Sequence, residues 1–126
     1  MSETEKMTAL AVQALDSKKA ENVKIIDIAK ISDIADYFVI ANGTNRNQVQ
    51  AMADAVEETL GKAGMHARSV EGYQAAHWIL MDYGDVVFHI FDRESRSFYD
   101  LERIWRGGKN FDPASMIVAA VSPDNI

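Results

Sequence analysis

The sequence predicts a single domain of the α/β (α+β) class, with a mixed sheet of about five strands and flanking helices. Its 126 residues can bury one hydrophobic core but not two. Apolar residues make up 48% and charged residues 25%, as in an ordinary globular protein. Amphipathic helical patterns and short apolar runs follow one another in the order α-β-β-α-β-β-β-α, which indicates helices packed against one sheet.

The first helix is predicted over residues 3–19, where apolar residues recur at helical spacing. Residues 22–31 are rich in β-branched side chains and predict a strand. The short apolar run at 37–41 is typical of a buried central strand, and residues 66–70 are a further candidate strand.

The second helix follows the polar stretch at 42–48. Thr44 or Asn45 can cap it, because a side-chain oxygen at this position accepts a bond from a free backbone N–H. The apolar residues that follow form the clearest helical stripe in the chain. Gly61 and Gly64 mark its end.

Residues 77–91 predict a β-hairpin that turns at Tyr83 and Gly84. A two-residue turn at this point places Trp78 directly opposite His89. The pair would form a semi-polar cluster on one face of the hairpin.

A last helix begins near Asp92 or Ser95, either of which can cap it. The residues that recur at helical spacing along it are Phe98, Leu101, Ile104 and Trp105. We expect the first three to pack in the core. For Trp78, Tyr99 and Trp105 the sequence leaves packing and partner binding balanced. Two glycines then end the helix, so we divide the chain into a domain of residues 1–108 and a C-terminal extension of residues 109–126 without an assigned role.

Net charge and composition narrow the function. The formal net charge is −6, which argues against binding mainly through nucleic-acid phosphates and favours a basic protein partner. The chain has no cysteine, so disulfides and thiolate metal sites are excluded. No apolar run is long enough to cross a bilayer and the N-terminus is no signal peptide, so we expect a cytoplasmic protein without membrane contact.

Catalytic chemistry finds little support. His89 could act as a general base, but no nucleophile lies beside it in the sequence. The histidines show no metal-ligand spacing, and no spacing singles out an acid/base pair among the carboxylates. The stretch "NGTN" lies where a helix N-terminus could hold an anion, but an ordinary helix cap is favoured because no Walker lysine follows. We therefore assign no catalytic, metal-binding or cofactor-binding residue, and no cofactor.

Three segments together resemble the ribosomal silencing factor RsfS (Iojap) family: "DYFVIANGTN", "WILMDYGDVVFHIF" and "RSFYDLERIW". The resemblance covers roughly residues 5–105. It implies a nucleotidyltransferase-like fold without enzymatic activity. It also implies binding to the large ribosomal subunit through the basic ribosomal protein uL-fourteen. There the protein would block joining of the small subunit and silence translation under nutrient limitation.

Carried over residue by residue, the resemblance implies one partner-binding surface. Its residues are Trp78, His89, Phe91, Arg96, Tyr99, Asp100, Leu101 and Glu102. The acids would meet basic groups of the partner, and the aromatics would form the desolvated centre, with little direct nucleic-acid contact. Self-association through the apolar "MIVAAV" of the extension is a further expectation. Two alternatives stay open, a nucleotidyltransferase-like enzyme with "NGTN" on a phosphate and an adaptor for another basic protein.

Overall fold

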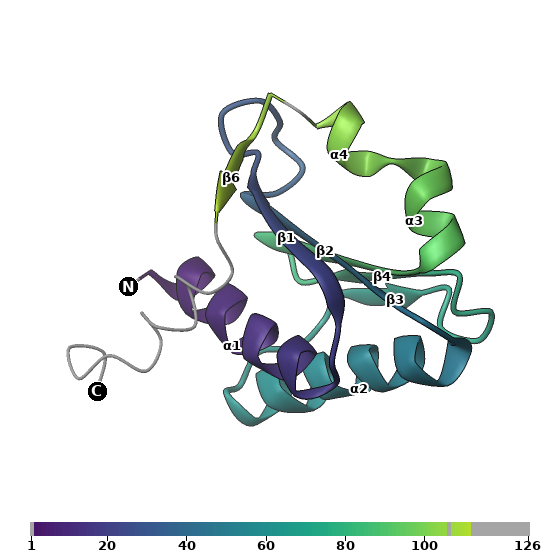
Figure 1. Ribbon diagram of the computed structural model, residues 1–126. Coiled ribbons are helices and arrows are strands. Elements are labelled where there is room, and N and C mark those ends of the chain that lie inside the picture. The colour runs from purple at the N-terminus through teal and green to yellow at the C-terminus, as the bar shows by residue number, and fades with distance from the viewer. Residues whose placement is uncertain (1, 106, 112–126) are drawn as a thin grey trace.

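The computed structural model describes residues 2–105 and 107–111, which form a six-stranded mixed sheet with helices on both faces (Figure 1). In chain order the elements are α1 (Glu3–Ser17), β1 (Glu21–Asp27), β2 (Tyr37–Gly43), α2 (Arg46–Lys62), β3 (Ser69–Glu71), β4 (Trp78–Asp82), β5 (Val86–Asp92), α3 (Arg93–Tyr99), α4 (Leu101–Ile104) and β6 (Lys109–Phe111). The predicted α/β class and the five predicted strands are confirmed. Within the described part, no helix has the length and apolarity to cross a membrane.

The strand order is β3-β4-β5-β2-β1-β6, so β5 and β2 occupy the centre of the sheet. These two strands pair in parallel, and the remaining neighbours are antiparallel. The strands β2 and β5 end at the same level of the sheet, where Gly43 pairs with Asp92. Because α2 follows β2 and α3 follows β5, both helices begin at the same end of the sheet but lie on opposite faces (Figure 1).

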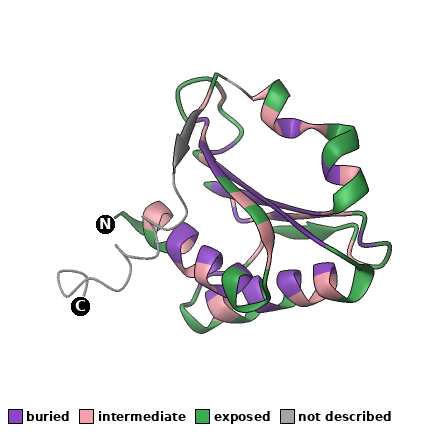
Figure 2. Cartoon of the chain, in the orientation of Figure 1, coloured by how far each residue is buried: buried purple, intermediate pink, exposed green. Residues whose placement is uncertain are grey.

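The two faces of the sheet differ in how completely they are covered. On one face α1 and α2 pack over the larger core, which includes Leu15, Met52 and Phe88. On the other face the short helices α3 and α4 lie over a smaller cluster that includes Phe38 and Phe91. Figure 2 shows buried residues recurring along α1 and α2, whereas α3 and α4 are mostly exposed or half-buried. The thinner cover belongs to the face that carries the predicted site.

The hairpin turn differs from the predicted one. Tyr83 and Val86 form the closing pair, with the Tyr83 N–H donating to the Val86 carbonyl over 3.0 Å. The turn residues are therefore Gly84 and Asp85, not Tyr83 and Gly84. Gly84 has a φ of +85°, and a glycine at the first turn position is the signature of a type II′ hairpin turn.

The shifted turn changes the pairing between β4 and β5. Trp78 faces Phe91, and His89 faces Leu80, so the predicted direct pairing of Trp78 with His89 is wrong. The register moves by two residues, which keeps every side chain on its predicted face because the strand period is two. Trp78 and His89 consequently remain diagonal neighbours on one face.

The predicted last helix is broken in two at Asp100. This residue has the left-handed conformation, with φ 49° and ψ 54°, which ends α3 and restarts the chain as α4 in a new direction. Leu101 is buried as predicted. Phe98 and Ile104 are 81% and 61% exposed, so their predicted place in the core is wrong. Because of this break, the apolar residues of α3 and α4 do not form one continuous stripe on a single helix face.

The sheet continues into the segment predicted as a C-terminal extension. β6 pairs with β1 in antiparallel fashion and adds an edge strand that the sequence did not predict. The apolar "MIVAAV" and the rest of residues 112–126 lie outside the described residues. The division at residue 108 therefore stays a prediction.

Candidate partner-binding surface

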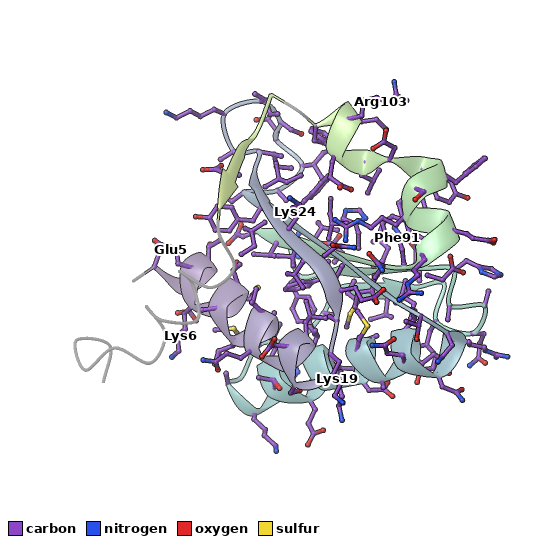
Figure 3. The ribbon with its side chains drawn as sticks, viewed as in Figure 1. Glu5, Lys6, Lys19, Lys24, Phe91 and Arg103 are labelled. Carbon is purple, nitrogen blue, oxygen red and sulfur yellow. The ribbon has the colours of Figure 1, made fainter. Side chains whose placement is uncertain are left out.

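The predicted site residues come from three neighbouring elements, β4, β5 and the α3–α4 segment. β5 leads directly into α3, and Asp92 joins them as the helix cap. Its Oδ1 accepts from the Ser95 N–H over 2.8 Å, which confirms a predicted cap. Phe91, the preceding residue, lies between the sheet and α3 (Figure 3). The chain thus brings the strand and helix parts of the site together locally.

An aromatic cluster fills the space between β4, β5 and α3. The Trp78 ring lies 4.6 Å from Tyr99 and 5.1 Å from Phe91, measured between ring centroids. The Trp78 Nε1–H also donates a hydrogen bond of 3.1 Å to Nδ1 of His89. Aromatic contacts at these distances add to the stabilisation from buried area. The cluster connects the interior to Tyr99, which is 43% exposed.

His89 is an interior residue, only 5% exposed. Burial lowers the pKa of its imidazole to about 4, because the charged form loses its hydration. Its Nε2 atom has no hydrogen-bond partner among the residues that the structure describes. His89 is therefore a neutral group that supports the surface from below.

Arg96 is also buried, although the sequence assigned it to the partner. Its guanidinium donates to the Asn22 carbonyl, to Asn42 Oδ1 over 3.1 Å, and to both carboxylate oxygens of Glu102 over 3.4 and 3.2 Å. These bonds connect α3 with β1, β2 and α4. A nearby exposed arginine, Arg93, forms a second link to β1 through bonds of 2.8 and 2.5 Å to Glu21.

The predicted site residues thus divide into two groups. His89, Phe91, Arg96 and Leu101 are buried, and Trp78, Tyr99, Asp100 and Glu102 are at least partly accessible. The sequence missed Phe98, the most exposed large apolar residue described, whose ring lies 5.1 Å from that of Tyr99. The one sequence signal for the exposure of Phe98 is the helix break at Asp100. A single aspartate is a weak signal for the left-handed conformation that makes this break.

The "NGTN" stretch is an ordinary helix cap. Asn45 Oδ1 accepts from the Gln48 N–H over 2.8 Å, as predicted. The Thr44 N–H and hydroxyl both donate to the Gln48 side chain, over 2.6 and 2.9 Å. The polar groups of this stretch are therefore engaged within the protein. Over residues 2–105 and 107–111, no group of three or more His, Asp or Glu could hold a metal ion.

Comparisons with known proteins agree on one family. The family model described as "Ribosomal silencing factor during starvation" (RsfS) matches residues 1–124, well beyond the segments that carry the resemblance. A Ribosomal silencing factor RsfS from Halalkalibacterium halodurans is 42% identical over 101 residues, which cover 80% of this chain and 86% of that protein.

Two further matches extend the comparison to structure and to a eukaryote. A crystal structure of a Chromobacterium violaceum protein has a TM-score of 0.81 and 32% identity, covering 88% of this chain and 92% of that one. A mouse protein named "Mitochondrial assembly of ribosomal large subunit protein 1" is 28% identical over 123 residues, or 92% of this chain and 52% of its own length.

Proposed function

The chain belongs to the RsfS family of ribosomal silencing factors, and we propose that it binds the large ribosomal subunit and keeps the small subunit from joining. The family description names starvation, and the name of the mouse relative refers to the large subunit. We infer that the contact is with ribosomal protein uL-fourteen and that the effect is steric. Occupancy of the surface is then the whole activity, and no chemical step is required.

One observation carries the proposal: an accessible aromatic row on a thinly covered face. The rings of Trp78, Tyr99 and Phe98 follow one another, with centroid distances of 4.6 and 5.1 Å. Carboxylates flank the row at Glu94, on the exposed side of α3, and at Asp100, whose Oδ2 forms an exposed ion pair of 3.2 Å with Arg103. Aromatic residues dominate binding hot spots, and a negative rim attracts a basic partner. This composition fits a basic protein better than bare RNA.

The proposal is tested by sedimentation of purified subunits at a magnesium concentration where they join. The wild-type protein should travel with the large subunit and reduce the joined peak. Tyr99→Ala should weaken binding by about 2 kcal/mol, roughly thirtyfold, as expected for a hot spot. Phe98→Ala should also weaken binding. Because this side chain has little packing within the domain to lose, the weaker binding would not result from lost stability.

Val70→Ala is the matched control. Val70 is a partly exposed apolar residue on β3 and pairs with Met81, whose side chain belongs to the core beneath α1 and α2. Its loss should leave binding unchanged. Equal binding by wild type, Tyr99→Ala and Phe98→Ala would refute this surface, and a wild-type protein that stays at the top of the gradient would refute the ribosomal function. Magnesium-dependent binding of nucleoside triphosphates in a calorimeter would instead favour the nucleotidyltransferase-like alternative.

A further inference from the structure

Trp78 connects the accessible aromatic row to the interior of the sheet. Its ring packs against Tyr99 on one side, and its indole N–H points inward to Nδ1 of His89, 3.1 Å away. The two residues lie on neighbouring strands, β4 and β5, whose pairing is fixed on both sides of the bond. The buried His89 thus contacts Trp78, the inner member of the ring pair that Trp78 and Tyr99 form.

The hydrogen bond determines which nitrogen of His89 carries the proton. Nδ1 accepts from the indole, so in a neutral ring the proton is on Nε2. Burial lowers the pKa of His89 to about 4, which keeps the ring neutral near pH 7. A protonated imidazole would instead have an N–H at both positions and could not accept. His89 is therefore a constant acceptor for Trp78 under ordinary conditions.

Packing alone does not account for a histidine at this position. The ring lies 4.6 Å from Phe38 and faces Leu80 across the hairpin, an apolar setting. Its Nε2–H finds no partner within the described residues, and burial of such a donor is unfavourable. A phenylalanine would fill similar space without that penalty. What the imidazole adds is the acceptor for the indole.

We propose that His89 is a positioning residue, which fixes the rotation of the Trp78 ring and so holds Tyr99 where a protein partner can contact both rings. The inference rests on the proposed function for its binding consequence. It differs from the role first expected for His89, which was direct contact with the partner. Without the bond, the indole can rotate about its side-chain torsions, and the ring that supports Tyr99 moves with it.

The first test measures the indole itself. In a proton–nitrogen NMR spectrum, the Nε1–H signals of Trp78 and Trp105 are assigned with a Trp105→Phe variant. We expect the Trp78 N–H to exchange slowly with solvent in the wild type and at least tenfold faster in His89→Phe. His89→Asn should restore part of the protection, because the asparagine Oδ1 lies near the place of the imidazole Nδ1. An indole that exchanges equally slowly in His89→Phe would overturn the inference.

The second test measures affinity for the large ribosomal subunit with the same variants. His89→Phe should weaken binding about tenfold, the effect of one lost hydrogen bond, and His89→Asn should recover part of it. Tyr83→Phe is the matched control, because it removes the other buried polar group without a described partner, the Tyr83 hydroxyl, which lies in the other core. It should change neither the indole signal nor binding.

The outcomes separate the inference from the proposed function. If His89→Phe frees the indole but binds like the wild type, the positioning role is refuted and the proposed function stands. If the wild type does not bind, the proposed function fails, and indole exchange still decides whether His89 fixes Trp78. Should His89→Phe not fold, His89→Leu removes the same hydrogen-bond acceptor with another apolar side chain and should free the indole and weaken binding to a similar degree.

Discussion

Arg96→Met should destabilise the protein by about 3 kcal/mol, because Arg96 is the buried connection between α3 and the sheet. The methionine keeps the aliphatic stem but loses all bonds from the guanidinium to Asn22, Asn42 and Glu102. Removal of one partner of a buried ion pair typically costs about 3–5 kcal/mol. The Glu102 side chain is 37% exposed, so water can solvate the remaining carboxylate, and we expect the lower end of that range.

Urea unfolding followed by circular dichroism measures this loss. In a domain of this size it corresponds to a fall in Tm of about 12 °C. The matched comparison is Arg93→Met, the same exchange on the same helix. The Arg93 side chain is 64% exposed in its pair with Glu21, so its loss should be much smaller. Equal losses in the two variants would refute the argument from burial.

Three other predictions follow. The free energy of unfolding should fall by about 3 kcal/mol between pH 6.5 and pH 4. The cause is that the histidine binds a proton in the unfolded chain, whereas the buried His89, with its pKa of about 4, does not. Urea titrations across this range should show a shallower fall in His89→Phe, and an equal slope would contradict the low pKa of His89. Asp100→Gly should raise the free energy of unfolding by up to about 1 kcal/mol, since glycine adopts the left-handed conformation without strain and the side-chain loss is confined to an exposed ion pair of 3.2 Å with Arg103. No gain in urea unfolding would contradict the argument from strain. Amide hydrogen exchange should be slowest in β2 and β5 and fastest in α4, a four-residue helix on the thinly covered face; equal protection would argue against local opening of this face.

The sequence predicted the elements whose signals are local. Residues 3–19 and the stripe after Asn45 correspond to α1 and α2, and the caps at Asn45 and Asp92 are confirmed. These signals depend on periodicity and on bonds that span three residues, so a short window of sequence contains them. The family and the face of the hairpin that carries Trp78 were also predictable.

Other features depend on contacts that no local pattern contains. The hairpin register depended on which neighbour of Gly84 completes the turn, and two choices satisfy the same alternation. The break at Asp100 depends on one residue, and it alone separates the exposed Phe98 from the buried Leu101. β6 forms because β1 offers an open edge, and its own three residues give no periodic signal.

The same reasoning explains why the sequence identified the site but not which of its residues are accessible. β5 is a central strand that is buried on both faces, so alternation cannot tell a supporting residue such as His89 from one that touches a partner. Accessibility is instead decided by the helices above. Arg96, on the first of them, is only 8% exposed, whereas Tyr99, three residues later, is 43% exposed. A loss of binding in an Arg96 or Phe91 variant would therefore report disturbed support. Variants at accessible residues such as Tyr99 and Phe98, measured beside their stability, are the ones that can report contact with the proposed partner.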